Sequence, residues 1–183
     1  MSHSYYYLVS SLPLLLFGQR PPVSYDEFLA DCQRIMTAQD YALMEAAVLR
    51  PRPAFQGRNA VLDQWIQFMN HCCNEIARTC ALKARKDPID YVRGDISFDP
   101  FVADLIHQAE KMHDPLAGEK LLDKAKWQKL DELAGGHHFD LEFLIVYSLK
   151  LQMAERYREI ESERGKDILN GFEKESLAIS QKA

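Results

Sequence analysis

The sequence lacks the motifs that mark the best-known enzyme sites. It contains no Gly-x-Ser-x-Gly, no Gly-Lys-Ser/Thr and no Gly-x-Gly-x-x-Gly, the patterns of a nucleophile elbow, a phosphate-binding loop and a dinucleotide-binding turn. Low-complexity tracts are missing as well. These absences do not exclude an enzyme, but they favour a binding or structural role. We therefore expect a non-catalytic protein with no cofactor and no bound metal.

Long hydrophobic runs are also absent, and the longest one, Leu8 to Phe17, lies near the start. It has ten residues and includes Pro13, whereas a membrane-spanning helix needs ~20. No Lys or Arg precedes this run and no Ala-x-Ala-like site follows it, so a secretory signal is not favoured. We expect a cytoplasmic protein whose first segment docks into its own core, with Pro13 bending or starting a helix.

The chain has little excess charge, and the excess is acidic. The net charge is −5, with ten Lys/Arg against nine Asp/Glu in residues 1–94 and twelve against eighteen in residues 95–183. Such a chain has no long-range attraction for a phosphate backbone, so nucleic acid is a poor candidate partner. The spacing of its four cysteines fits no disulfide scaffold, and we expect reduced thiols. These are Cys32, Cys72, Cys73 and Cys80.

Helix signals recur along the whole chain. Ser24 to Glu27 forms a capping box, and Thr37 repeats the capping pattern before a helix that we expect to end at Arg50. A long helix should run from Asn59 to about Lys86. Its apolar residues recur in steps of three and four and should form one buried stripe. The stripe comprises Leu62, Trp65, Ile66, Met69, Cys73, Ile76 and Cys80.

The second half of the sequence predicts three further helices and a weaker terminal one. Asp99 should cap a helix with Pro100 at its first position, and Met112 should be among its inward-facing residues. The next helix spans about Pro115 to Ala134, with an interruption at Gly118. Asp140 should cap a long helix that begins in the interior and ends at the surface. Apolar spacing after Gly165 allows a terminal helix, through Ile168, Leu169, Phe172 and Leu177.

No segment keeps the strict alternation of a half-buried strand, so we predict an all-α protein of six to eight helices in a compact bundle. A single domain over residues 1–183 is the simplest organisation. Two small lobes, 1–94 and 95–183, remain an alternative. The segments Asp40–Arg50 and Asp140–Lys150 align without gaps, an echo that would fit a duplicated lobe. Any helix that begins with an acidic cap and ends in a cation would show the same pattern.

Histidines and cysteines leave a rival hypothesis open, a small helical metal-dependent or redox protein. Glu110 and His113 have the Glu-x-x-His spacing, but a di-iron bundle needs a second such motif, and none exists. His71, Cys72 and Cys73 are adjacent but have no Cys-x-x-Cys pair beside them, and Gly135-Gly136 precede two further histidines. The rival would use residues from this set, namely His71, Cys72, Cys73, Glu110, His113, His137 and His138.

Basic residues are the candidate contacts with a protein partner. One group, Arg78, Lys83, Arg85 and Lys86, lies near the end of the expected third helix. The other, Arg156 and Arg158, lies in the charged second half of the last long helix. Solvated helix ends also look like this, since exposed charges need no partner. The partner-binding candidates are Arg78, Lys83, Arg85, Arg156 and Arg158.

The opening of the chain resembles a known family. "YYYLVSSLPLLLFGQRPPVSYDEFL" is similar to the start of a short bacterial family found alongside the proteins of V-type ATP synthases. It also resembles, more distantly, the C subunit of V/A-type ATP synthases, which is called the d subunit in eukaryotic V-ATPases. Tyr5, Tyr7 and Leu8 take the places of its Tyr-x-Tyr-Leu pattern, and "LDELAGGHHFDLEFLIVYSLKLQMAERY" resembles a second block of the short family.

This resemblance implies a non-catalytic, all-helical protein that couples two parts of the ATP synthase. The C subunit sits on the membrane rotor ring and receives the central shaft, so ion or proton transport is coupled through it. The expected partners are therefore the shaft and the membrane ring, at a cytoplasmic site peripheral to the inner membrane. Two departures are visible: the chain is shorter than the three lobes of the C subunit, and Ser10 and Ser11 stand where an Arg usually follows the pattern. A self-associating helical adaptor is a third hypothesis.

Overall fold

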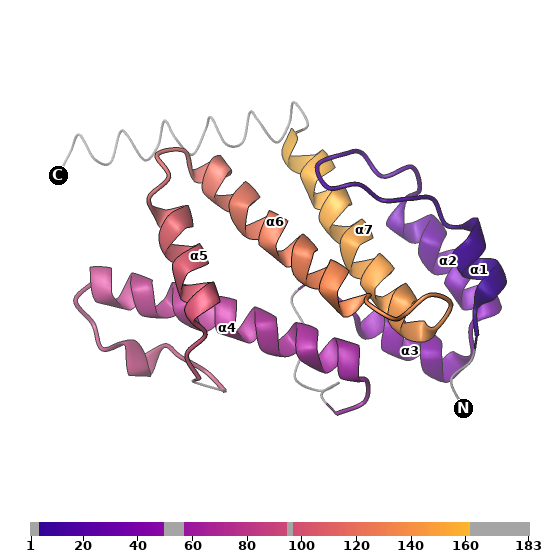
Figure 1. Cartoon of the computed structure of the whole chain (residues 1–183), viewed down its shortest axis with the longest axis horizontal. Helices are drawn as coiled ribbons and strands as arrows, with labels where there is room; N and C mark the ends of the chain where they lie inside the picture. Colours follow the sequence, from indigo (N-terminus) through magenta and orange to yellow (C-terminus); the bar gives the residue numbers. More distant parts are fainter. Residues whose placement is uncertain (1–3, 50–56, 95–96, 162–183) are drawn as a thin grey trace.

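The computed structural model describes residues 4–49, 57–94 and 97–161, with side chains as far as Tyr157. These residues form seven α-helices and one 3₁₀ turn, with no strand among them, which confirms the all-α prediction (Figure 1). In chain order the elements are α1 (Tyr6–Ser11), α2 (Tyr25–Ile35), α3 (Ala38–Ala46), α4 (Ala60–Lys83), η2 (Pro88–Asp90), α5 (Pro100–Glu110), α6 (Pro115–Leu133) and α7 (Leu141–Glu161).

Helix α7 is the central element of the bundle. It contacts α2, α3, α4 and α6, while α5 packs between α4 and α6 (Figure 1). Its first half is buried on almost every side, as the sequence predicts, and Leu144, Ile145 and Leu149 are fully buried. One hydrophobic cluster joins side chains from α1 through α7, so elements from both sides of residue 94 share a core. The division into lobes at that position stays a prediction.

The apolar N-terminal segment docks along α7, as expected. Tyr5, Leu8 and Leu15 are buried in the main core. The Tyr147 hydroxyl donates a hydrogen bond of 3.0 Å to the Pro13 carbonyl, and the Phe17 ring lies 5.5 Å from the ring of Tyr157. Pro13 neither bends nor starts a helix, because α1 already ends at Ser11. Leu12 is extended, as the residue before a proline prefers.

The predicted helix starts are confirmed by their caps. Ser24 and Glu27 form a complete capping box on α2, and Thr37 Oγ1 accepts from the backbone N–H of Asp40. Asn59 and Asp99 likewise cap α4 and α5. These contacts are local, which is why the sequence alone could place them.

Helix α3 ends earlier than the sequence predicts, at Ala46 instead of Arg50. A side chain from α7 takes over the backbone groups beyond that point. Gln152 Nε2 donates to the Ala47 carbonyl at 2.7 Å, and Gln152 Oε1 accepts from the Leu49 N–H at 3.3 Å. Hydrogen bonds to the Gln152 side chain therefore take the place of those that a further turn of α3 would make.

Gly118 does not interrupt α6, which was a wrong prediction. The helix is continuous through it, and Gly118 is buried where α5 crosses closely. A Cβ at this position would lie 2.9 Å from the carbonyl oxygen of Ala109. Met112 is a second correction: α5 ends at Glu110, and Met112 stays 40% exposed instead of facing inward.

The two segments of the echo, Asp40–Arg50 and Asp140–Lys150, start differently, and a duplicated lobe stays a prediction. Asp40 lies inside the first turn of α3, whereas Asp140 accepts from Phe143 N at the start of α7. The expected terminal helix after Gly165 lies outside the described residues. Within the described part of the chain, no helix has the length and apolar character needed to cross a bilayer.

Candidate functional site

The described surface contains an apolar groove with a charged edge. It lies between α4, α5, α6 and α7 and has a volume of about 650 Å³. Volumes in this range are typical of binding pockets. We call it the α4 groove. It is lined by Leu49, Trp65, Met69, Asn70, Cys72, Cys73, Ile76, Leu105, Ile106, Glu119, Leu122, Asp123, Lys126, Met153 and Arg156.

The apolar stripe of α4 explains why the groove exists. Only its first part is buried as predicted, at Leu62, Trp65 and Ile66. Farther along, Cys73 is exposed and Ile76 is 41% exposed. The predicted burial of Cys73 is therefore wrong.

Beyond Ile66, the buried face of α4 is displaced by one residue from the predicted stripe. Phe68 and Cys72 are buried, whereas the stripe has Met69 and Cys73 at the next positions. Phe68 lies against α5 and α6. Asn74, also buried, exchanges two hydrogen bonds with the backbone of Arg93, which ties that side of α4 to the following loop. The remaining apolar residues of the stripe thus line an open groove.

A buried carboxylate forms the charged edge of the groove. Asp123 is 2% exposed and accepts from Lys126 Nζ at 2.8 Å and from the Arg156 guanidinium. Arg156 also lies 3.6 Å from Glu119. A buried charge is tolerated only when it is paired in this way. The edge therefore links α6 to α7 and fixes the position of Arg156 beside the groove.

Two hydrogen-bond donors of groove-lining residues have no acceptor among the described residues. They are the indole N–H of Trp65, which is fully buried, and Nε of Arg156. Buried donors nearly always have a partner in folded proteins. Both donor atoms are inaccessible to solvent, so they lie behind the groove surface, out of reach of an occupant. Next to this edge, burial and then the Asp123 carboxylate raise the pKa of the Tyr157 hydroxyl.

The structure does not bring the predicted basic residues together. Arg78 pairs with Glu75 at 3.4 Å, and Lys83 reaches Glu110 on α5 at 3.3 Å. Arg85 follows α4 with a positive φ of 55°. Arg156 lies instead on α7 and pairs with Asp123 and Glu119 of α6. The Arg158 side chain lies outside the described residues.

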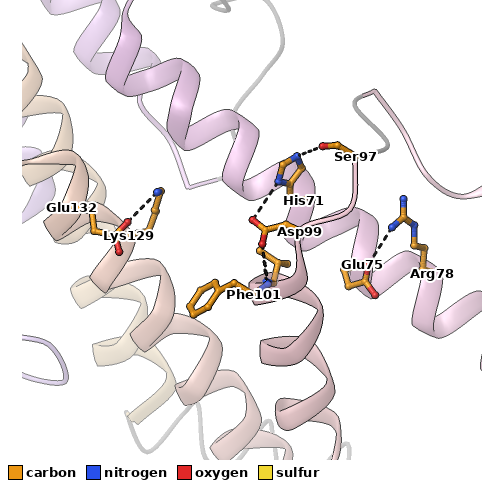
Figure 2. A network of polar contacts seen from close by, with 9 residues as sticks. His71, Glu75, Arg78, Ser97, Asp99, Phe101, Lys129 and Glu132 are labelled. Carbon is orange, nitrogen blue, oxygen red and sulfur yellow. Dashed lines mark hydrogen bonds and ion pairs between the residues drawn. The ribbon is translucent and has the colours of Figure 1, made fainter.

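His71 connects α4 to the start of α5 (Figure 2). Its Nε2 lies 3.0 Å from Ser97 Oγ and its Nδ1 lies 3.8 Å from Asp99 Oδ2, while Asp99 Oδ1 accepts from the Phe101 N–H. The two neighbouring thiols differ in exposure: Cys72 is buried and Cys73 is exposed. Burial raises the pKa of the Cys72 thiol to about 11, which keeps it protonated near neutral pH. His71, Cys72 and Cys73 therefore do not form the metal site that the metal-dependent hypothesis would need here.

A different trio meets the distance requirement for a metal site. One ligand atom each from His137, Asp140 and Glu142 lies within 4.8 Å of the others, and this is the one such group among the described residues. Internal hydrogen bonds already occupy all three. His137 Nδ1 lies 2.7 Å from Asp140 Oδ2, and Glu142 accepts from Asn59 at 3.1 Å. Sequence reasoning named His137 and His138 but missed the two carboxylates, because their approach to His137 depends on the conformation of the connection between α6 and α7, which helical periodicity does not give.

The other predicted ligands do not converge. Glu110 is taken up by its ion pair with Lys83 on α4, and His113 and His138 are exposed. The Glu-x-x-His spacing of Glu110 and His113 falls where α5 ends, at Glu110, so the two residues do not share a helix face. Helical periodicity cannot place ligands together once the helix has stopped.

The N-terminal block and the start of α7 expose several large apolar side chains, which we call together the N-terminal patch. Its members are Tyr6, Tyr7, Leu14, Leu16 and Phe139, with exposed fractions from 41% at Phe139 to 87% at Tyr7. The rings of Tyr6 and Phe139 lie 4.7 Å apart. Tyr5 anchors the segment, since its N–H donates to the Phe139 carbonyl at 2.6 Å and its hydroxyl donates to Asp40. The block thus divides into an anchoring side and a side free for contact.

The fold and these two surfaces define an all-helical protein with a groove and an apolar patch suited to protein contacts. Residues 100–176 match the model of the family DUF2764, described as proteins of unknown function. The match begins at α5 and continues past the end of α7, and it covers less than half of the chain. No curated protein and no solved structure shows a significant match to this chain.

Proposed function

We propose that this protein is a non-catalytic component of a V/A-type ATP synthase or ATPase, similar to the C subunit, that helps couple the central shaft to the membrane rotor. The proposal places it in the cytoplasm, peripheral to the inner membrane and held there by protein contacts. It rests on the resemblance of the opening residues and on the all-helical fold. The observation that carries it is the arrangement of the opening block as an exposed surface.

The tyrosine-rich motif is well suited to a protein contact. Tyr5 and Leu8 are buried and hold the segment in place, while Tyr6 and Tyr7 stay 54% and 87% exposed. Leu14 adds a further apolar side chain that is 79% exposed. Large exposed apolar side chains can mark a protein contact, and tyrosine is enriched in interface cores. Of the three residues that carry the resemblance, Tyr7 is thus available for docking, while Tyr5 and Leu8 hold the segment in place.

Co-purification tests this role. The tagged chain, expressed in its native cells, should be recovered from membranes with the other ATP synthase proteins in a constant ratio. Tyr7→Asp and Leu14→Asp place a charge in the N-terminal patch and should release the chain from that complex. Arg34→Glu changes the charge at a residue whose side chain is 74% exposed on α2, and it serves as the matched control that should remain bound. Recovery of the parent chain only as free protein would overturn the proposal.

The two rival functions predict different measurements. A metal-dependent protein, now best represented by the trio His137, Asp140 and Glu142, should contain stoichiometric metal when purified without an affinity histidine tag. A self-associating adaptor should sediment as a stable homodimer and stay off the ATP synthase. Both can be checked on the preparation used for the co-purification.

A further inference from the structure

The connection between α6 and α7 brings together three side chains that are all common metal ligands. His137 comes from the connection itself, and Asp140 and Glu142 flank Leu141, the first residue of α7. One ligand atom from each lies within 4.8 Å of the other two. Ligand atoms around one Zn²⁺ ion lie ~3.4 Å apart, because each bond to the ion is about 2.0–2.2 Å long. Small side-chain rotations therefore bring all three onto a single ion.

Backbone hydrogen bonds hold this connection in one conformation. Gly136 has a positive φ of 88°, which turns the chain sharply after α6. The His137 N–H donates to the Ala134 carbonyl at 3.0 Å, and the Phe139 carbonyl accepts from the Tyr5 N–H at 2.6 Å. The connection is thus tied to α6 and to the N-terminal segment. An ion that binds here has to order little of the chain, which lowers the cost of binding.

Hydrogen bonds from outside the trio orient both carboxylates. Asp140 Oδ1 accepts from the Phe143 N–H at 3.1 Å, and Glu142 Oε1 accepts from the Asn59 side-chain amide at 3.1 Å. Asn59 is itself buried, and its own side-chain oxygen caps α4. Outer contacts of this kind fix the direction of ligating carboxylates in metal sites. Because a carboxylate has two oxygens, one accepted hydrogen bond does not use it up as a ligand.

The contact between His137 and Asp140 is compatible with a bound ion. Nδ1 of the imidazole lies 2.7 Å from Oδ2 of the carboxylate, a hydrogen bond when the ring proton is on Nδ1. Moving that proton to Nε2 frees the Nδ1 lone pair, and the ion then takes the place of the proton. The two side chains are 32% and 27% exposed, so an ion can reach them. The charges of Asp140 and Glu142 together balance a divalent cation.

We propose that His137, Asp140 and Glu142 bind one divalent ion of the first transition series, represented by Zn²⁺, with water completing its coordination. The imidazole favours such an ion over Mg²⁺ and Ca²⁺, which prefer oxygen ligands. The ion joins the connection to the start of α7 and, through Glu142 and Asn59, to the start of α4. It reinforces the fold beside the N-terminal patch and needs no part in catalysis. Zinc binding leaves the coupling role open, because co-purification decides that role separately.

Zinc titration of the isolated full-length chain, made without a histidine tag, tests the site. The exposed thiols of Cys73 and Cys80 can also bind zinc, so both are replaced by Ser in every chain. Competition with a chromophoric chelator measures the stoichiometry and the dissociation constant. The Ser-substituted parent should bind one Zn²⁺. His137→Gln and Glu142→Gln should each weaken binding at least ~100-fold, because a lost ligand costs more than the ~10- to 100-fold loss of an outer contact.

His138→Gln is the matched control, because it removes the adjacent, exposed imidazole and leaves the trio intact. It should bind Zn²⁺ as tightly as the Ser-substituted parent does. In the imidazole ¹H–¹⁵N spectrum of that parent, one equivalent of Zn²⁺ should shift the ring signals of His137 and not those of His138. This spectrum tests the site even where a substitution affects folding, which the far-UV circular dichroism of each variant checks.

Three results overturn the proposal. The first is no saturable zinc binding by the Ser-substituted parent. The second is an affinity of the His137→Gln chain equal to that of the parent. The third is an equal loss of affinity in the His138→Gln chain, which would identify exposed histidines as the ligands. Displacement of Zn²⁺ by an equal concentration of Mg²⁺ would contradict the class of ion proposed.

Discussion

Neutralising Asp123 should be among the most damaging single changes in this protein. Asp123→Asn keeps the shape of the side chain but removes the charge that compensates Lys126 and Arg156. Asp123 is 2% exposed and the Lys126 side chain is 17% exposed, so water can replace little of the lost interaction. Breaking a buried ion pair by removing one partner costs about 3–5 kcal/mol. The Arg156 side chain is 38% exposed, which screens part of that loss.

We therefore expect Asp123→Asn to lower the free energy of unfolding by about 3 kcal/mol, the low end of that range. Urea unfolding followed by far-UV circular dichroism measures it. With a slope of about 2 kcal/mol per molar urea, the midpoint should fall by about 1.5 M. Glu132→Gln is the matched control on the same helix. It breaks the Lys129–Glu132 pair of 3.0 Å, in which Glu132 is 67% exposed (Figure 2), and should cost less than about 0.5 kcal/mol.

A change of less than about 0.5 kcal/mol for Asp123→Asn would refute the reasoning, because surface pairs already account for that much. The coupling energy can be checked separately by a double-mutant cycle with Arg156→Met. The coupling energy between Asp123 and Arg156 should be larger than the coupling energy between Lys129 and Glu132.

Three further predictions concern packing, pH and capping. Gly118→Ala should destabilise the fold by about 1 kcal/mol, because crowding of the Ala109 carbonyl at 2.9 Å outweighs the ~1 kcal/mol gained in helix propensity. Stability should fall between pH 8 and pH 10 by about 1.3 kcal/mol for each of Cys32 and Cys72. Burial raises their pKa values from 9.0 to about 12 and about 11, so the unfolded chain loses protons first. Asp99→Ala removes the cap of α5 and should cost about 1 kcal/mol in urea unfolding.

Each of these predictions has a result that contradicts it. A gain in stability for Gly118→Ala would show that α5 can shift away at little cost, whereas Gln128→Ala, at an exposed position of the same helix, should be near neutral. The alkaline loss should persist when the exposed Cys73 and Cys80 are both replaced by Ala. A flat profile to pH 10 in the parent chain would exclude the buried thiols as its cause. An Asp99→Ala chain as stable as the parent would mean that the contacts of His71 with Ser97 hold the α5 start alone.

The sequence by itself determined the fold class and most helix starts. Side-chain caps such as Ser24 and Asp99, and apolar periodicity such as that of α4, are local signals that no distant residue has to complete. The docking of the N-terminal run was also readable, since the run is too short to span a membrane and too apolar to leave in water.

Only the tertiary structure decided where helices end and which faces stay open. The end of α3 depends on Gln152 from α7, and the role of Gly118 depends on the approach of Ala109. The turn of the buried face on α4, which exposes Cys73, follows from which neighbours α5 and α6 provide. These features arise from contacts between residues far apart in the chain, and a pattern along one segment carries no information about the segment that will cover it.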